Sequence, residues 1–115
     1  MTGTVDAAGP GAQRWVGRRV IACAKGAYGG YAEFVIADAG MVFDAPAQLD
    51  DTQAAAFFMP FHLAWLGLHQ RGGLRADEVV LIHAGAGGAG SAAIQLAKAA
   101  GARVLTTAGR GREDS

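Results

Sequence analysis

The sequence predicts an α/β fold in which a β-rich first part is followed by helices and then by one strand–helix–strand unit. Three observations support this prediction. Short β-branched runs separated by glycine turns fill the first part, alanine-rich stretches follow, and a glycine-rich turn joins a later apolar run to a helix. Hydrophobic residues make up 51% and charged residues 17% of the 115 residues, as is typical of a globular chain.

The first part, residues 1–48, is predicted to be a partial β-rich domain. Turn residues separate its apolar runs, first at Gly9-Pro10-Gly11 and again at residues 26–30. The predicted strands lie at residues 2–8, 15–25, 31–36 and 41–43. Pro46 closes the last of them.

The pattern changes at residue 49, where we place the boundary to a partial nucleotide-binding domain that covers residues 49–115. Asp50, Asp51 and Thr52 can cap a helix, which is predicted over residues 53–58. Pro60 is predicted to start a second helix that runs to about residue 70 and ends at the following glycine pair.

A strand–turn–helix block at residues 79–98 is the most informative part of the sequence. Its first five residues are an apolar run that suits a strand buried on both faces. A helix is predicted from Ala89 onward, and Gly101 is placed to end it. A second β-branched run at residues 103–107 follows at the distance that a βαβ crossover needs.

The turn in this block has the spacing G-x-G-x-x-G at Gly85, Gly87 and Gly90. The first glycine allows a tight turn, the second lets a pyrophosphate approach the backbone, and the third lets helix and strand pack closely. Free N–H groups at the helix N-terminus would then receive the phosphates. The residues predicted to bind the cofactor here are Gly85, Ala86, Gly87, Gly88, Ala89 and Gly90. The sequence therefore predicts a Rossmann-type dinucleotide site.

The residues after the second strand indicate which dinucleotide. An NAD site usually holds a carboxylate there for the ribose 2′-hydroxyl, whereas residues 103–112 contain no Asp or Glu. Thr107 and Arg110 offer a hydroxyl and a cation instead, which suit a 2′-phosphate. The predicted cofactor is therefore NADPH.

Charge and cysteine content exclude several classes of function. Ten basic and ten acidic residues cancel, so neither nucleic acid nor a membrane is an expected partner. A single cysteine, Cys23, fits a reducing compartment, and the N-terminus lacks the features of a signal peptide. A soluble, cytoplasmic protein is expected.

Taken together, these residues resemble the medium-chain dehydrogenase/reductase superfamily, and most of all its zinc-independent quinone oxidoreductases. The segments that carry the resemblance are Gly3-Thr4-Val5, Val20-Ile21, residues 29–34, Ala54-Ala55-Ala56 and residues 83–99. The resemblance implies part of a β-rich, GroES-like catalytic domain before part of a Rossmann-type domain. Members of this family are longer at both ends, so a truncated chain is expected.

The resemblance also bears on zinc. Zinc-dependent relatives carry four closely spaced cysteines between the strands that match Val20 and Tyr31, as a closed structural site requires. Here that interval holds Cys23 alone, and a cysteine ligand expected near residues 56–63 is missing. We therefore expect no metal, and interpret the three histidines as structural or surface residues: His62, His69 and His83.

Residues 59–65 match the family segment that lines the nicotinamide end of the site. Many relatives have a threonine that aligns with Leu63 and bonds the carboxamide, which leucine cannot do. The resemblance therefore leaves this contact to backbone groups or to His62. Tyr31 matches a position near the active-site cleft, but strand packing explains it equally well, and no catalytic residue is identified.

The activity implied by the resemblance is hydride transfer from NADPH to a small-molecule quinone or enone. Two alternatives stay open: an NADPH-dependent enoyl reductase acting on an acyl thioester, and a truncated nucleotide-binding fragment without turnover. A homodimer is implied only where the full nucleotide-binding domain is present.

Overall fold

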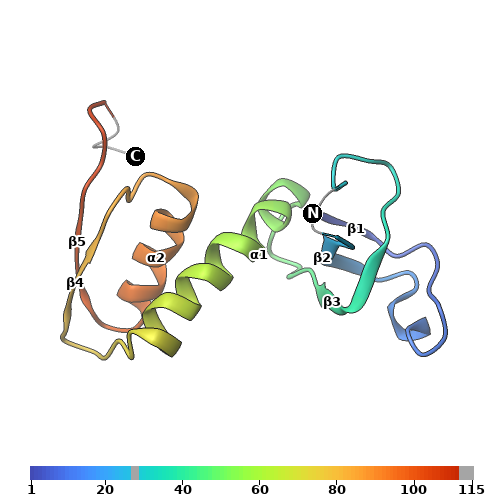
Figure 1. Cartoon of the computed structure of the whole chain (residues 1–115), viewed down its shortest axis with the longest axis horizontal. Coiled ribbons are helices and arrows are strands. Elements are labelled where there is room, and N and C mark those ends of the chain that lie inside the picture. The colour runs from blue at the N-terminus through green and yellow to red at the C-terminus, as the bar shows by residue number, and fades with distance from the viewer. Residues whose placement is uncertain (27–28, 112–115) are drawn as a thin grey trace. The chain divides into compact units, whose positions relative to one another are not determined.

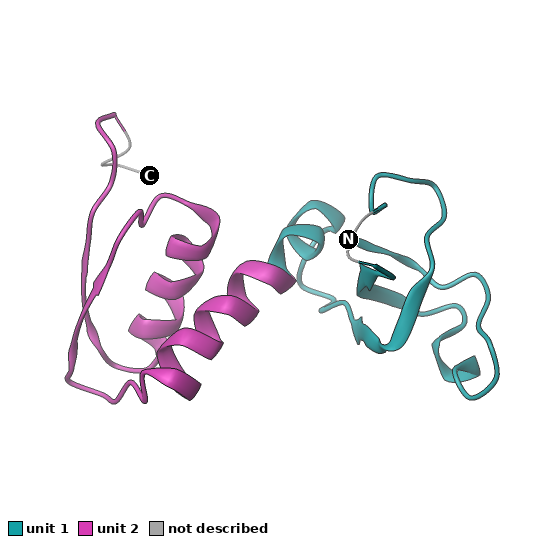
Figure 2. Ribbon diagram, viewed as in Figure 1, with its two compact units in different colours: residues 1–57 teal, residues 58–115 magenta. Residues whose placement is uncertain are grey.

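The computed structural model of the chain describes residues 1–26 and 29–111. It divides into two compact units, unit 1 (residues 1–57) and unit 2 (residues 58–115), coloured separately in Figure 2. Two residues of a predicted turn, Ala27 and Tyr28, and residues 112–115 of the polar tail lie outside the described residues. The division into units falls inside a helix, later than the predicted domain boundary at residues 48 and 49, and the domain assignment stays a prediction.

Unit 1 contains a three-stranded antiparallel sheet in the order β1-β2-β3. Its strands are β1 (Thr2–Thr4), β2 (Arg19–Ala24) and β3 (Ala37–Asp44), with a short 3₁₀ helix at Gln13–Trp15 before β2 (Figure 1). The central strand supplies three consecutive buried residues, Val20, Ile21 and Ala22. Both of its edges are paired, which explains why the core of this unit lies on β2.

The third strand lies later in the chain than predicted. Residues 31–34 form bends and residues 35–36 have no regular structure, and β3 instead includes the predicted short strand at residues 41–43. The alternation of apolar residues in 31–36 suggested a buried face, yet Tyr31 is 108% and Ile36 is 76% exposed. No helix or strand of the described residues covers these side chains. Residues 31–36 therefore gain no burial of apolar surface from adopting a strand.

The start of helix α1 (Asp51–Trp65) follows the prediction closely. The Gln53 N–H donates to the Asp50 carboxylate at 2.8 Å, and the Asp50 N–H donates to the Gln53 side-chain oxygen at 3.1 Å. This reciprocal pair is a capping box, which satisfies two N–H groups at the helix start. Arg19 holds the preceding loop by donating to the carbonyl oxygen of Leu49 at 2.9 Å and to the Asp51 carboxylate at 2.9 Å.

The prediction of two helices separated at Pro60 is wrong. Pro60 lies inside α1, which continues to Trp65 and is followed by a π-helical segment, Leu66–Arg71. Proline removes one i→i−4 hydrogen bond, and the helix formers on either side of it keep the remaining ones. The predicted end is confirmed, because Gly72 and Gly73 follow the helix and Gly73 has a φ of +60°. No helix among the described residues is long and apolar enough to cross a membrane.

Unit 2 contains the predicted βαβ unit. Strand β4 (Val79–Ile82) leads through the glycine turn into helix α2 (Gly88–Ala99), and β5 (Arg103–Thr106) lies parallel to β4, with Val79 opposite Arg103 and Ile82 opposite Thr106. Gly101, with a φ of +80°, ends α2 as predicted. In Figure 1, α2 lies against the β4–β5 pair, and its Ala92 and Ala97 are buried there.

One face of this two-stranded sheet is open. Val79 is 60%, Leu81 is 56% and Leu105 is 49% exposed, whereas Ile82 is buried. The prediction that the first strand is buried on both faces is therefore wrong for the described residues. In an alternating strand, α2 can cover only the side chains that point toward it.

Candidate functional site: a glycine turn at the carboxyl end of β4

The glycine turn begins directly after β4 with a residue in an unusual backbone conformation. Ala84 has a φ of +55°, in the left-handed region that L-residues rarely adopt. Its carbonyl oxygen accepts a hydrogen bond from the Gly87 N–H at 2.9 Å, which closes a tight turn. Gly87 is extended, with φ −87° and ψ 163°, and α2 starts at the next residue.

Two of the three motif glycines lie where no side chain fits. A Cβ on Gly85 would collide with the Thr106 hydroxyl oxygen and would lie 3.0 Å from Ile94 Cδ1. A Cβ on Gly90 would collide with the Ala84 carbonyl oxygen and would lie 2.8 Å from Gly85 Cα. At Gly87 the nearest atom is 3.3 Å away. The loop is therefore packed against the first turn of α2 by its own backbone.

The first turn of α2 presents free donors at this loop. The Ser91 N–H bonds back to the Gly87 carbonyl oxygen at 2.8 Å, and it is the first N–H with an acceptor in the helix pattern. The N–H groups of Gly88, Ala89 and Gly90 precede it, and no side chain in the described part of the chain caps this helix end. Three adjacent N–H groups at the positive end of a helix dipole can bind an anion such as a phosphate.

Thr107 lies beside the glycine turn, as the sequence interpretation requires. Its N–H donates to the Ile82 carbonyl oxygen at 3.1 Å, and its own carbonyl oxygen accepts from the Gly85 N–H at 2.9 Å. The Thr107 hydroxyl oxygen accepts from the Ala84 N–H at 3.3 Å and lies 3.1 Å from His83 Nδ1. Thr107 is exposed, so the hydroxyl is accessible at the edge of the turn.

Arg110 lies in the segment beyond β5 and is exposed. No carboxylate of the described residues pairs with it, whereas Arg18 and Arg19 are paired with Asp44 and Asp51. No ion pair with the described residues therefore occupies its guanidinium, which has the charge and the donors that a contact to a 2′-phosphate requires.

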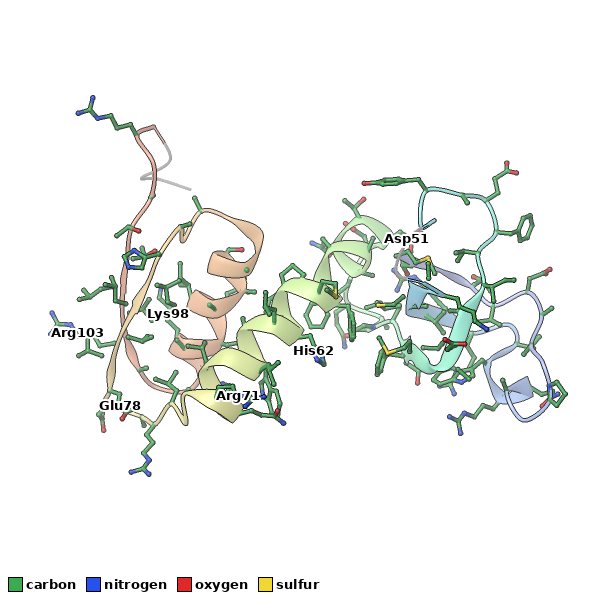
Figure 3. All side chains as sticks on the ribbon, viewed as in Figure 1. Asp51, His62, Arg71, Glu78, Lys98 and Arg103 are labelled. Atoms are coloured by element: carbon green, nitrogen blue, oxygen red, sulfur yellow. The ribbon has the colours of Figure 1, made fainter. Side chains whose placement is uncertain are left out.

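His62 lies on α1 and does not join the residues of the glycine turn. A Cβ on Gly88 would lie 3.7 Å from Pro60 Cγ, so the Pro60 side of α1 faces the turn. His62 is about 200° further around the helix. Figure 3 shows its side chain on the side of α1 away from α2, and its ring lies 5.2 Å from that of Phe58. Its predicted contact with the carboxamide stays a prediction, and Leu63 beside it is 59% exposed.

Sequence reasoning missed the contact that His83 makes. The sequence suggests only a structural or surface residue, yet His83 shares the Thr107 hydroxyl with the backbone of the turn. Its position directly before Ala84 is visible in the sequence. Its pairing with Thr107, 24 residues later, is not, because it depends on the register between β4 and β5.

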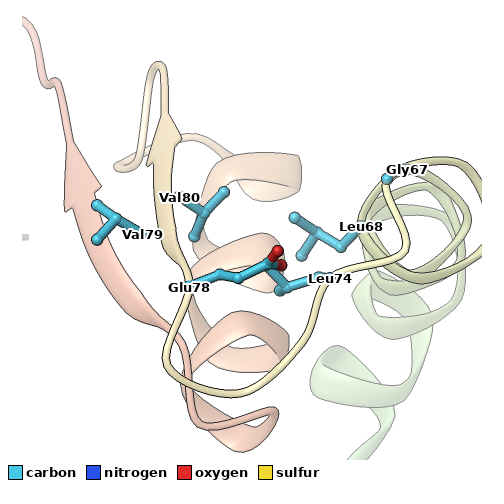
Figure 4. Close-up of a pocket in the computed structure, with 7 residues that line it drawn as sticks. Gly67, Leu68, Leu74, Glu78, Val79 and Val80 are labelled. Atoms are coloured by element: carbon cyan, nitrogen blue, oxygen red, sulfur yellow. The ribbon is translucent and has the colours of Figure 1, made fainter.

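A separate cavity of about 350 Å³ lies at the other end of β4 (Figure 4). It is lined by Gly67, Leu68, Gly72, Leu74, Glu78, Val79 and Val80. Ligands of open α/β sheets bind at the carboxyl ends of the strands, whereas this cavity lies at the amino end of β4. It is therefore not part of the glycine-turn site. Among the described residues, no three His, Cys, Asp or Glu side chains are grouped so that they could hold a metal ion.

Sequence comparison finds close relatives among larger proteins, although no protein-family model matches the chain. A phthioceranic/hydroxyphthioceranic acid synthase of Mycobacterium tuberculosis is 44% identical over 108 residues, which cover 93% of this chain and 5% of the synthase. The quinone oxidoreductase of Sus scrofa is 46% identical over 81 residues, which cover 70% of this chain and 25% of that protein. The chain thus spans a small part of either relative.

Solved structures share the fold. An alcohol dehydrogenase superfamily protein from Novosphingobium aromaticivorans matches 94% of this chain and 34% of its own, with a TM-score of 0.86 and 39% identity. The quinone oxidoreductase from Thermus thermophilus, also solved in complex with NADPH, matches 83% of this chain and 31% of its own, with a TM-score of 0.75 and 42% identity. The CurK enoyl reductase matches 96% and 33%, with a TM-score of 0.79 and 30% identity.

Proposed function

Because this chain belongs to the medium-chain dehydrogenase/reductase superfamily, we propose that it carries the dinucleotide-phosphate site of an NADPH-dependent reductase. The observation that supports this most directly is the turn at Gly85 and Gly90, where a Cβ would collide with the Thr106 hydroxyl or the Ala84 carbonyl oxygen. A turn that excludes side chains lets a pyrophosphate approach the backbone. The free N–H groups of Gly88, Ala89 and Gly90 would hold its oxygens.

The choice of NADPH rests on the residues beyond β5. The Thr107 hydroxyl and the Arg110 guanidinium, which pairs with no carboxylate of the described residues, would contact the 2′-phosphate. Residues 103–112 hold no carboxylate that would accept the 2′-hydroxyl of NADH. The Thermus thermophilus relative was solved with NADPH, which supports the same choice. At the other end of the cofactor, His62 and the backbone around Leu63 are proposed to contact the carboxamide.

The bound nicotinamide would supply the hydride, and the residues of this chain would position it. The glycine turn fixes the pyrophosphate against α2, and Thr107 and Arg110 orient the adenosine end. The proposed acceptor is a quinone or an enone, as the name of the Sus scrofa relative suggests. This chain also shares sequence identity with a phthioceranic/hydroxyphthioceranic acid synthase and with the CurK enoyl reductase. That similarity favours a second acceptor class, an enoyl thioester.

The acceptor classes can be separated by turnover. With NADPH present, we expect the purified chain to oxidise the cofactor faster with a quinone than with an enoyl thioester. The loss of absorbance of the reduced nicotinamide would measure both rates. The reverse order would assign the enoyl reductase function instead. Nucleotide binding without oxidation by either acceptor would identify a nucleotide-binding chain that does not turn over.

Arg110→Ala should weaken NADPH binding by about tenfold to a hundredfold and leave NADH binding unchanged, because a charge-assisted hydrogen bond contributes roughly 1.5–3 kcal/mol. Dissociation constants from isothermal titration would measure both. Arg103→Ala is the matched control: it removes an arginine at the start of β5, opposite Val79 and at the far end of the strand from Thr107. Equal weakening of both nucleotides by Arg110→Ala would argue against a 2′-phosphate contact.

A further inference from the structure

The hydroxyl of Thr107 has two neighbours besides any ligand, and one of them is a histidine. The Ala84 N–H donates to Thr107 Oγ1 at 3.3 Å, and His83 Nδ1 lies 3.1 Å from the same oxygen. A threonine hydroxyl has one proton to donate and two lone pairs to accept with. The Ala84 N–H uses one lone pair, so the state of His83 Nδ1 determines what the hydroxyl has left.

The two protonation states of Nδ1 leave different groups free. When Nδ1 carries no proton, it accepts the hydroxyl proton of Thr107, and only a lone pair of Oγ1 faces outward. A phosphate oxygen that carries no proton can only accept, so it cannot bond to this lone pair. When Nδ1 carries a proton, it donates to Oγ1, both lone pairs are used, and the hydroxyl proton is free to donate to an anion. The neutral ring can hold its single proton on either nitrogen, so this state requires no net charge on His83.

We infer that His83 is a positioning residue that sets the selectivity of this site for a 2′-phosphorylated adenosine ribose, by controlling the direction of the Thr107 hydroxyl bond. This inference rests on the proposed function. It adds that binding of the 2′-phosphate is coupled to a proton on His83 Nδ1. A ribose 2′-hydroxyl can both donate and accept, so it pairs with Thr107 in either state and carries no such coupling.

The surroundings of His83 contain few charges that could produce the same coupling. The glycine turn and the first turn of α2 contain no titratable residue, and neither does β4. Within residues 78–111, Glu78 and Arg103 lie at the amino ends of β4 and β5, and Lys98 lies in the last turn of α2. Arg110 lies beyond β5. Among the described residues of this segment, His83 is therefore the side chain whose bond with Thr107 Oγ1 can set the direction of the hydroxyl.

The direction of the effect follows from this coupling. A proton on His83 Nδ1 frees the Thr107 hydroxyl to donate to the 2′-phosphate, so removal of the imidazole should lower the preference for NADP⁺ over NAD⁺. A side chain that donates from the same position should keep that preference.

The test is isothermal titration of the 115-residue chain with NADP⁺ and with NAD⁺. The ratio of the two affinities should be about tenfold higher in the unchanged chain than in His83→Leu, as expected for one hydrogen bond to a charged group. His83→Asn places an amide N–H near the Nδ1 position and should restore the preference for NADP⁺.

Two further variants protect the test against misfolding. Thr107→Val keeps His83 and removes the hydroxyl, so it should lower the preference for NADP⁺ as His83→Leu does, and His83→Leu should lower it no further in that background. His69→Leu removes a histidine from the π-helical segment and should leave the preference of the unchanged chain intact. An NADP⁺ preference in His83→Leu equal to that of the unchanged chain would overturn the inference alone. Failure of the unchanged chain to bind either nucleotide would overturn the proposed function, and the inference with it.

Discussion

Gly90→Ala should lower the free energy of unfolding of unit 2 by about 3 kcal/mol, the upper part of the range for overpacking a closely packed site. The new Cβ would collide with the Ala84 carbonyl oxygen and would lie 2.8 Å from Gly85 Cα and 2.9 Å from the Ala84 carbonyl carbon. All of these are backbone atoms, so no side chain can rotate away. The turn must move away from α2, and phosphate binding should be lost together with stability.

Trp65 provides the measurement. It lies in unit 2, and Trp15 in unit 1 is the second tryptophan of the chain, so a Trp15→Phe background isolates its fluorescence during urea unfolding. Gly88→Ala is the matched control, because its Cβ would lie 3.7 Å from its nearest neighbour, Pro60 Cγ, an ordinary contact. It should change stability by no more than about 0.5 kcal/mol. Equal losses of unfolding free energy in Gly90→Ala and Gly88→Ala would show that close packing is not what requires a glycine at position 90.

The glycine turn could be predicted from the sequence because its determinants are local. The spacing of Gly85, Gly87 and Gly90 between an apolar run and an alanine-rich helix specifies the turn and the start of α2. The capping box at Asp50 and Gln53 is equally local, since both partners lie within one helical turn. Local patterns therefore place such elements within a few residues of their observed bounds.

The errors arose where distant residues decide the outcome. Residues 31–36 alternate as a strand should, but β2 pairs with residues 37–44 instead, and the sequence does not state which segment β2 selects. The error at Pro60 is the exception, because residues next to it on both sides keep the helix intact. At the site, the approach of His83 to Thr107 depends on the parallel register of β4 and β5, which local pattern cannot supply.

Gly85→Ala should also destabilise unit 2, by roughly 2–3 kcal/mol, but for a different reason from Gly90→Ala. Its Cβ would collide with the Thr106 hydroxyl oxygen, and Thr106 is held in place by donating to the Ile82 carbonyl oxygen at 2.9 Å. The obstacle here is a side chain on the neighbouring strand, and it can be removed by mutation. Urea unfolding followed through Trp65 would again give the free energies.

A double-mutant cycle with Thr106→Ala distinguishes the two kinds of glycine. Thr106→Ala alone should cost about 1 kcal/mol through its lost hydrogen bond. In the double variant the collision with Oγ1 is gone, so the combined loss should be smaller than the sum by about 1–2 kcal/mol. Ile94 Cδ1 at 3.0 Å and Thr106 Cβ at 3.1 Å still crowd the new methyl group, so recovery should be incomplete. Gly85→Ala combined with Arg103→Ala, at the far end of β5, should be additive. If Gly85→Ala were also additive with Thr106→Ala, the Thr106 hydroxyl would not be what requires a glycine at position 85. Gly90 differs, because its close contacts are with backbone atoms that no side-chain mutation can remove.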